Sequence, residues 1–385
     1  MSEIRVTNIL GENGNSPVNF TQGINMSGIV TATAFVSDTP LSNRNIIING
    51  AMSVAQRGTS VAWASNDYLT CDRWHHTINN SAGRFTSKQT ADSPDGLGGK
   101  CLELDVTTAD TSIASNEHAI LAYRFEGQDV QQLAKGTAGA KKFTISFYVR
   151  GNGNATYMCE FFDRTNTRLI RQQFSVTSSW SRVTLTFNNE TSGGTINNDN
   201  SHEFDLQIWL HAGSDFTSGS YTANTWSGQT NANRAVGISS LFSSTDNFLK
   251  ITGVQLEVGP VATPFEHRSI GDELALCKRY YQQFPQGPAD AYGPIGSGRI
   301  RNATNAHIIV SFPEMRSSPT VTKVGNLRIL HAATSTAVNS VASSHMARNI
   351  IFIEGIVSSG LTQGEGCIMT ANNDSTGKIT LASEL

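Results

Sequence analysis

Short runs that alternate apolar and polar residues, separated by turns rich in Gly, Asn, Ser and Asp, fill the chain from residue 43 to about residue 267. Alternation with a period of two is typical of half-buried antiparallel strands. The expected strands are residues 83–90, 100–107, 119–125, 143–149, 157–163, 182–187, 204–210 and 248–256. This series predicts a two-sheet jelly roll. One short helix is expected at residues 129–133.

The composition agrees with a chain built from strands and turns. It contains 41 Ser, 39 Thr, 31 Asn and 34 Gly, whereas only 15% of its 385 residues are charged. Thr favours strands, while Asn, Ser and Gly favour turns. The expected fold class is therefore all-β, with a surface solvated by hydroxyls and amides instead of ions.

Charge and hydropathy exclude several classes of partner. The 28 Lys and Arg nearly balance the 31 Asp and Glu, so we expect no nucleic acid as partner. No apolar stretch approaches the ~18 residues that a membrane span needs, and we expect no membrane insertion. The five cysteines are scattered without metal-type spacing, which predicts reduced thiols in a protein made in a cytosol.

The N-terminal segment, residues 1–45, differs from the rest of the chain. Between residues 18 and 35 its apolar residues form short alternating runs, with no patch large enough for a core. Such a segment buries its apolar face only by adding to another surface, so we interpret it as an assembly arm. A floppy leader is the alternative.

The pattern changes again after the jelly roll. Residues 272–284 carry acidic residues early, basic residues late and apolar residues at helical spacing, which predicts a short helix. Further strands are expected at 306–312, 320–324, 327–331, 349–354, 366–370 and 378–385. The expected domains are the arm (1–45), a jelly roll (46–268), a helical linker (269–288) and a smaller C-terminal β-sandwich (289–385).

Four motifs in this chain resemble a family of bacteriophage tail proteins. They are NIIINGAMSVAQRG at 45–58, DRW at 72–74, ITGVQLEVG with ATPFEHR between 251 and 268, and CKRYY at 277–281. Residues 311–322 are similar to the C-terminal β-domain that often follows, and residues 23–35 resemble N-terminal segments of virion proteins of marine phages. The resemblance implies a tail fibre or tail-tip protein with a carbohydrate-binding-module-like jelly roll, usually a homotrimer.

Two of these motifs also have a structural interpretation. Gln255 and Glu257 lie at the end of the last jelly-roll strand, where their side chains could tie the strand to the following turn. Pro264 and Phe265 would anchor the exit of the chain. In the 72–74 motif, we expect a charged pair beside a large core aromatic.

Motifs for catalysis are absent. There is no Gly-x-Ser-x-Gly elbow, no His-Glu-x-x-His helix, no phosphate-binding loop and no calcium loop of the helix-loop-helix type. We therefore expect no catalytic residue and no enzymatic activity. A carboxylate pair for sugar hydrolysis stays open, because any two of the 31 acids could meet in the fold.

No metal or other cofactor is expected. His75 and His76 are adjacent, and neighbouring residues of a strand point to opposite faces, so local hydrogen bonding is the better interpretation. Asp105, Asp110 and residues 197–200, which include Asp199, could form a calcium site of the kind found in related jelly rolls. A solvated polar turn is the favoured alternative.

Glycan binding requires aromatic faces for the apolar side of a sugar ring and polar groups for its hydroxyls. The loop at 211–234 is the best candidate platform, Trp63 and Tyr68 in residues 61–68 make a second, and the C-terminal loops at 338–348 and 360–366 are a third. The candidate residues are Trp63, Tyr68, Phe216, Tyr221, Trp226 and His345. The alternative interpretation is that the large loop aromatics pack down over the end of the sandwich.

These observations lead to one functional expectation. The chain is expected to be a virion protein, a homotrimeric tail fibre or tail-tip protein assembled in the host bacterial cytoplasm. Residues 1–45 would attach it to other tail or baseplate proteins, and its β-domains would bind host surface polysaccharide. The alternatives are a purely structural baseplate, tail or head-decoration component and, lower in rank, a glycan-degrading tail enzyme.

Overall fold

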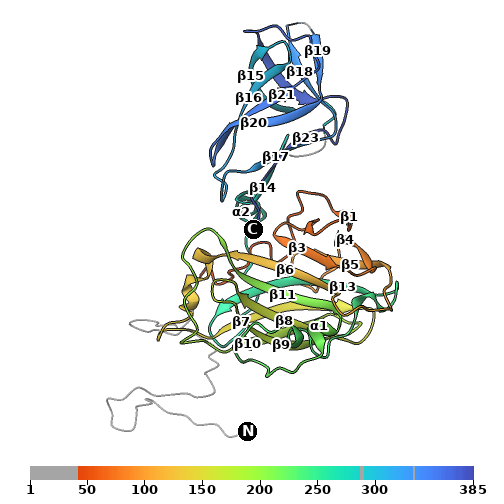
Figure 1. The fold of residues 1–385 in the computed structure, drawn as a ribbon, viewed down its shortest axis with the longest axis vertical. Coiled ribbons are helices and arrows are strands. Elements are labelled where there is room, and N and C mark those ends of the chain that lie inside the picture. The colour runs from red at the N-terminus through yellow and green to blue at the C-terminus, as the bar shows by residue number, and fades with distance from the viewer. Residues whose placement is uncertain (1–41, 287–289, 333) are drawn as a thin grey trace, which may run out of the picture. The chain divides into compact units, whose positions relative to one another are not determined.

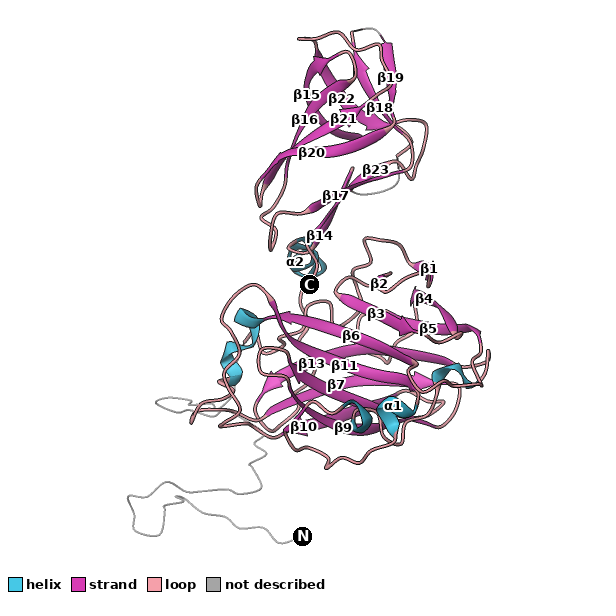
Figure 2. Ribbon diagram, in the orientation of Figure 1, coloured by secondary structure: helices cyan, strands magenta, loops and turns pink. Residues whose placement is uncertain are grey.

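Strands and turns make up almost all of the computed structural model, which describes residues 42–286, 290–332 and 334–385 (Figures 1 and 2). The all-β fold class is confirmed. A two-sheet sandwich with a jelly-roll-like arrangement precedes a smaller β-sandwich, and one short helix links them in sequence. The expected assembly arm, residues 1–45, lies outside the described residues except for residues 42–45.

The first sandwich is built from two antiparallel sheets. The six-stranded sheet has the order β1 (Ser60–Ala62), β4 (Arg84–Thr90), β5 (Cys101–Thr108), β13 (Phe248–Val258), β7 (Phe143–Gly151), β10 (Ser181–Phe187). The seven-stranded sheet has the order β12 (Ser227–Gly228), β9 (Arg168–Val176), β8 (Ala155–Asp163), β11 (His202–Ala212), β6 (His118–Glu126), β3 (Trp74–Asn79), β2 (Asp67–Tyr68).

Aromatic side chains from both sheets fill the space between them. Phe143 of β7 packs edge to face on Phe161 of β8 at 5.0 Å, and it stacks on Phe187 of β10 at 5.4 Å. Phe161 also stacks on Phe204 of β11 at 5.6 Å. These rings are buried, because alternate residues of each strand point to the inner face of the sandwich.

All the strands expected in this domain are present, but the sequence did not predict β3 and β9 or the short strands β1, β2 and β12. In β9 the buried residues Leu169, Ile170 and Arg171 follow one another, so the period of two is interrupted. In β3 the buried residues include His75 and His76, which read as polar positions. In both strands, polar side chains are buried by neighbouring strands and break the alternation of apolar and polar residues. The sequence pattern therefore did not reveal β3 or β9.

The short helical segments lie between strands. The helix expected at 129–133 is a 3-10 helix, Gly127–Leu133. Three other short segments are α1 (Ser214–Thr217) and the 3-10 turns Asn231–Asn233 and Leu241–Ser243. Among the residues that the structure describes, no helix is long and apolar enough to cross a bilayer.

The linking helix is shorter than expected. Helix α2 covers Ile270–Lys278, and Ser269 caps it by accepting a hydrogen bond from the Asp272 amide at 3.1 Å. The expectation of helix to residue 284 was wrong in its second half, because Tyr281–Phe284 form strand β14 and pair with β23. This pairing joins residues far apart in the sequence, so local spacing did not reveal it.

The second sandwich has a three-stranded and a seven-stranded sheet. The first has the order β14, β23 (Lys378–Ala382), β17 (Thr320–Val324). The second has the order β19 (Thr334–Val338), β18 (Leu327–His331), β22 (Gly366–Ala371), β15 (Pro294–Asn302), β16 (Asn305–Ser311), β21 (Ile350–Ile356), β20 (Ser340–Met346). The expectation of a loop at 338–348 was wrong, because β20 occupies most of this segment and pairs with β21.

The C-terminal residues contact the first sandwich through buried charges. Glu384 accepts from Arg73 at 2.7 Å and from Arg57 at 2.8 Å. The Arg73 guanidinium also lies 3.4 Å from the centre of the Tyr280 ring. Glu126, the last residue of β6, accepts from Tyr280 at 2.6 Å. Groups from both ends of the described chain thus meet around Arg73.

Hydrogen bonds support the structural interpretation of the two motifs. The Gln255 amide donates to Pro264 at 3.2 Å, and Glu257 accepts from the Thr263 amide at 3.0 Å, which ties β13 to the turn after it. In the 72–74 motif Trp74 is fully buried in the core. Arg73 pairs with Glu384. These residues therefore hold the fold together.

Candidate functional site

A cleft of about 370 Å³ lies on the seven-stranded sheet of the first sandwich, and we call it the sheet cleft. Alternate residues of neighbouring strands line it, since positions i and i+2 share a face. Trp209 of β11 pairs with Ile120 of β6, which pairs with Thr77 of β3. Phe216 of α1 lies against Trp209 at 5.3 Å and against His118 at 4.8 Å. The cleft thus has an aromatic wall over a flat sheet.

Polar side chains complete the lining of the sheet cleft. They include Arg124 on β6, Arg164 after β8, and Gln229 and Asn231 after β12. Gln229 and Asn231 are exposed, and the Arg164 side chain is 41% exposed. Amide and guanidinium groups supply the donors and acceptors that hydroxyl groups require. The volume lies within the ~300–1,000 Å³ range of small-ligand sites.

A buried ion pair lies beside the aromatic wall. Glu160 of β8 is fully buried and accepts from the Arg234 guanidinium at 2.5 Å. Arg234 also donates to Gln207 at 2.9 Å and lies 4.8 Å from the centre of the Trp209 ring. The Trp209 indole donates to Glu160 at 3.3 Å. This network fixes the rotamers of the side chains on the β11 side of the cleft.

A second buried carboxylate, Asp205 of β11, lies at the cleft. It is hydrogen-bonded by His202, and by Arg164 at 2.7 Å. Burial alone would raise the pKa of Asp205, but the hydrogen bond from His202 and the charge of Arg164 hold it below its usual value. Asp205 is therefore ionised at neutral pH. It orients Arg164, whose side chain remains partly exposed.

The histidines near the cleft are neutral. Burial lowers the pKa of His118, which lines the cleft. Burial and then the charge of Arg124 lower the pKa of His75 to about 3, and burial lowers the pKa of His76 to about 4. His75 contacts Arg124, while His76 lies 3.2 Å from the Ser87 hydroxyl. His75 and His76 are adjacent on β3 and therefore point to opposite faces of the sheet. Each makes its own local contact, which agrees with the interpretation of local hydrogen bonding drawn from the sequence.

The structure separates the three aromatic residues expected in the 211–234 loop. Phe216 lines the sheet cleft. Tyr221 lines a different hollow and lies under the Arg171 guanidinium at 5.2 Å. Trp226 donates to the Asn188 carbonyl at 2.8 Å and packs against the core. Trp226 thus covers the sandwich as the alternative interpretation describes.

The second pair of candidates lies away from the sheet cleft. Trp63 is half-buried, packs against the core and carries the Arg84 guanidinium over its ring at 4.7 Å. Tyr68 is 4% exposed, and its ring contacts His75. Its hydroxyl donates to Leu385 at 3.1 Å. The buried Tyr68 ring offers no face to a sugar, and we leave this residue out of the site proposed below.

His345, the last candidate, lies on strand β20 of the second sandwich. Its ring meets Phe352 of β21 edge to face at 5.9 Å. These two residues line a cleft of about 460 Å³ together with Ile309, His307 and other residues of β15 and β16. His345 thus lines a cleft, but it lies on a strand and not in the expected loop.

Several cleft residues were not singled out in the sequence. Trp209 lies in an expected strand, His118 directly precedes the strand expected at 119–125, and Arg234 lies at the end of the candidate loop. The available signal was the alternation Asp205, Gln207, Trp209 along β11, which places one aromatic and two polar side chains on one face. The partners on β6 and β3 depend on strand register, which the sequence does not display.

Asp110 belongs to a different group from the one considered in the sequence. Its carboxylate, the Glu117 carboxylate and the His211 imidazole have ligand atoms that all lie within 4.8 Å of one another. Asp105 instead pairs with Lys88 at 2.6 Å. Asp199 accepts from the Ser201 amide at 2.8 Å, as in a polar turn. Among the residues that the structure describes, the group that could hold a metal ion is thus Asp110, Glu117 and His211.

Comparisons with known proteins found no matching family model and no matching curated protein. Similar solved structures include the enzymatically active domain of tailspike protein 4 from bacteriophage CBA120, with 11% identity and a TM-score of 0.29. That match covers 56% of this chain and 21% of the tailspike chain, so this chain spans about a fifth of its length.

Carbohydrate-binding modules are also among the similar solved structures. TmCBM61 in complex with β-1,4-galactotriose has 9% identity and a TM-score of 0.29, with coverage of 56% of this chain and 99% of the module. The family 11 module of Lic26A-Cel5E from Clostridium thermocellum has 11% identity and a TM-score of 0.26, with coverage of 54% and 98%. Likeness with such low TM-scores supports no conclusion about the function of this chain.

Proposed function

We propose that this chain is a glycan-binding protein that uses the sheet cleft as its binding site. The observation that carries the proposal is the aromatic wall of Phe216 and His118 beside the exposed amides of Gln229 and Asn231. An aromatic face can pack on the apolar side of a sugar ring, while amides bond its hydroxyls. The neutral His118 imidazole contributes its ring face, because its Nε2 atom is hydrogen-bonded to the Asn79 amide at 2.9 Å.

Binding without hydrolysis is the activity that the cleft chemistry favours. Hydrolysis of a glycosidic bond ordinarily uses two carboxyl groups that flank the bond. Among the described residues that line the sheet cleft, Asp205 is the single carboxylate, and it is buried and held by His202 and Arg164. We therefore propose a non-catalytic glycan site with no cofactor.

The Phe216→Ala variant tests this site. We expect its affinity for the recognised glycan to fall about fivefold to tenfold, because a lost aromatic contact costs roughly 0.5–1.5 kcal/mol beyond its buried area. The full chain is first applied to a glycan array, and the strongest ligand is then titrated calorimetrically against both proteins.

Tyr292→Ala is the matched control, since Tyr292 is 50% exposed and lies in the second sandwich. Its affinity should equal that of the unaltered chain. An unchanged affinity in Phe216→Ala, or an equal loss in both variants, would contradict the placement of the site. No binding to any glycan would contradict the function itself.

The phage setting is part of the proposal. We infer a virion protein, a tail fibre or tail-tip protein, that attaches to other tail or baseplate proteins through residues 1–45 and binds host surface polysaccharide. The support is the resemblance of the motifs at 45–58 and 251–268 to phage tail proteins. Immunogold labelling of virions with an antibody to the chain tests it, and labelling at the distal end of the tail is expected.

Assembly as a homotrimer is the second part of this setting. Strand register aligns four apolar residues and one serine across five neighbouring strands of the second sandwich, in the order Leu330, Ile368, Ser297, Ile309 and Phe352. Ile368 is 45% exposed and Ile309 is 44% exposed, although outward positions of a solvated sheet are usually polar. A contact between copies would bury this apolar row.

Ile309→Glu tests whether copies meet through the apolar row. The unaltered chain should have the mass of a trimer in light scattering, and the variant should shift toward the monomer because a charge would be buried in the contact. Ile113→Glu is the control, since Ile113 is 43% exposed and lies in the first sandwich. A monomeric unaltered chain, or trimers of undiminished stability in Ile309→Glu, would contradict this contact.

A purely structural role is the second candidate, and the same apolar row favours it. A baseplate, tail or head-decoration component would use this face for contacts with other proteins instead of sugars. The glycan array separates the two functions. Firm binding to isolated tails or capsids without binding to any glycan would support the structural role.

A further inference from the structure

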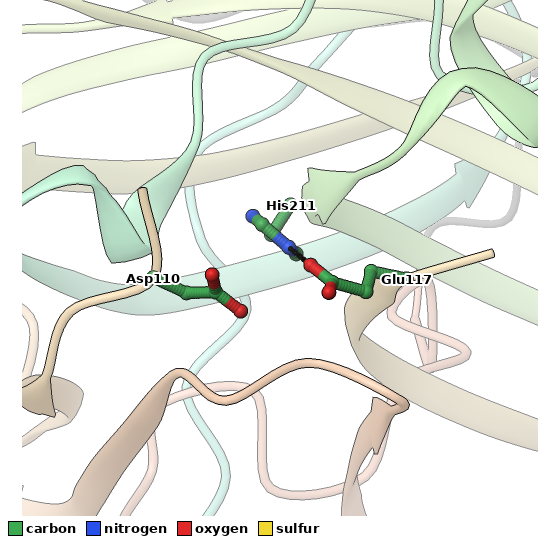
Figure 3. A group of neighbouring side chains, drawn as sticks. All are labelled: Asp110, Glu117 and His211. Atoms are coloured by element: carbon green, nitrogen blue, oxygen red, sulfur yellow. Dashed lines mark hydrogen bonds and ion pairs between the residues drawn. The ribbon is translucent and has the colours of Figure 1, made fainter. Parts of the chain in front are cut away.

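Three titratable side chains meet at one end of the first sandwich, outside the sheet cleft (Figure 3). Asp110 lies in the loop after β5, Glu117 directly precedes β6, and His211 lies near the end of β11. They are 6%, 5% and 0% exposed, respectively. One ligand atom from each lies within 4.8 Å of the other two. Metal ligands around a Zn²⁺ ion lie about 3–4 Å apart, so a small contraction would suffice.

Neighbouring groups hold two of these side chains in place. The His211 Nδ1 atom lies 2.7 Å from the Ser240 hydroxyl, and its ring packs 5.3 Å from Phe242. This contact leaves Nε2 facing Glu117 at 3.2 Å. Asp110 accepts from the Ser81 hydroxyl at 2.7 Å. A hydrogen bond at the second imidazole nitrogen and a bonded carboxylate are the supports that metal ligands commonly have.

The charge of the cluster calls for a cation. Asp110 and Glu117 are two buried carboxylates, and within the described parts of the chain no lysine or arginine forms an ion pair with either. The hydrogen bonds to Asp110 from the Ser81 hydroxyl and from the Ala82 amide at 2.8 Å come from uncharged groups. Burying an unbalanced charge is costly, whereas a divalent ion with a neutral imidazole would balance both carboxylates.

We propose that Asp110, Glu117 and His211 bind one divalent transition-metal ion, with Zn²⁺ as the probe. Two oxygens and one imidazole nitrogen suit Zn²⁺ better than Ca²⁺ or Mg²⁺, which take oxygen ligands. The ion would tie the loop at 109–117 to β11. The same loop accepts hydrogen bonds from Gly213 at 2.8 Å and from Asp215 at 2.9 Å, close to helix α1. The role of the ion is therefore to stabilise the fold of this loop and of the strand end beside it.

The full chain, treated with a chelator and dialysed, is titrated with Zn²⁺ by calorimetry. One equivalent should bind, and the unfolding temperature should rise by at least about 5 °C at a hundredfold excess over the dissociation constant. Co²⁺ in place of Zn²⁺ should give visible bands of oxygen and nitrogen ligation, without the thiolate charge-transfer band that any of the five buried cysteines would produce.

His211→Gln and Asp110→Asn should each lose the Zn²⁺ equivalent and the thermal shift. His267→Gln, at an exposed histidine outside the cluster, should keep both. Where a cluster variant fails to fold, the Co²⁺ spectrum of the unaltered chain tests the ligand set instead. Bands of oxygen and nitrogen ligation would support the proposal, and a thiolate charge-transfer band would contradict it. Absence of a bound equivalent, Zn²⁺ binding that survives both cluster variants, or a shift with Ca²⁺ but none with Zn²⁺ would each overturn the proposal.

Discussion

Replacing Arg234 with alanine is expected to lower the free energy of unfolding by about 3–5 kcal/mol, because Glu160 would remain buried without its cation. Glu160 is fully buried, and only 10% of the Arg234 side chain is exposed. The variant also uncovers Trp209, over which the guanidinium lies. Denaturant titration followed by tryptophan fluorescence measures the loss, and glycan affinity should fall with it.

Arg301→Ala is the matched control for this ion pair. The Arg301 side chain is 55% exposed and pairs with Glu354 at 2.9 Å, so its removal should cost less than about 1 kcal/mol. The double variant with Arg234→Met and Glu160→Leu should recover part of the stability, since neither member of the ion pair is left alone. Full recovery is not expected, because the buried Arg171 opposite Glu160 loses the charge of this carboxylate. Equal losses in Arg234→Ala and Arg301→Ala would contradict the assigned role of the buried pair.

Glu126→Ala should destabilise the contact between the two sandwiches by about 2–4 kcal/mol. The Glu126 carboxylate is fully buried and accepts two hydrogen bonds from Arg279 at 2.7 Å and one from Tyr280 at 2.6 Å. Its loss removes the acceptor that lies 2.6 Å from the buried Tyr280 hydroxyl and both acceptors of the Arg279 guanidinium. Limited proteolysis should then cleave the chain between the sandwiches faster than in the unaltered protein.

Acid titration adds a second measurement on Glu126. Burial alone would raise its pKa, but hydrogen bonds from Arg279 and Tyr280 hold it below the ordinary value of 4.5. Its contribution to stability is therefore present above pH 4.5 and is lost as the pH falls through the lower folded value. Glu126→Gln should lack this loss.

The control for Glu126 is Glu314→Ala, because Glu314 is 61% exposed and pairs with a half-exposed Arg348. Its proteolysis rate and stability should match those of the unaltered chain. A Glu126→Ala protein with unchanged proteolysis would show that other contacts, such as those of Arg73, suffice to join the sandwiches.

Secondary structure was predictable wherever the pattern is local. The alternation in β5 and β13 and the exact spans of β17 and β18 can be read from apolar and polar spacing alone. The same rules failed for β9 and β20. In β9 the alternation is interrupted by consecutive buried residues, and β20 has the polar composition of a loop but pairs with β21. Pairing partners, not local composition, made these segments strands.

The candidate site was predictable only in part. Phe216 was identified because an aromatic residue in a polar loop is a readable signal, but Trp226 gave the same signal and packs against the core. Which of the two borders a cleft depends on where the loop lies over the sheet. The group of Asp110, Glu117 and His211 was not predicted as a set, because its members are separated along the chain and meet only through strand pairing.

By itself, the sequence determined an all-β chain with two sandwiches and a short linking helix, because side-chain alternation and turn residues act over a few neighbouring positions. The tertiary structure decided what the sequence left open: the register that brings Trp209 beside Ile120, and the burial of Glu160 under Arg234. Both arise from contacts between distant segments. Such contacts set which side chains share a surface, and therefore where a ligand can bind.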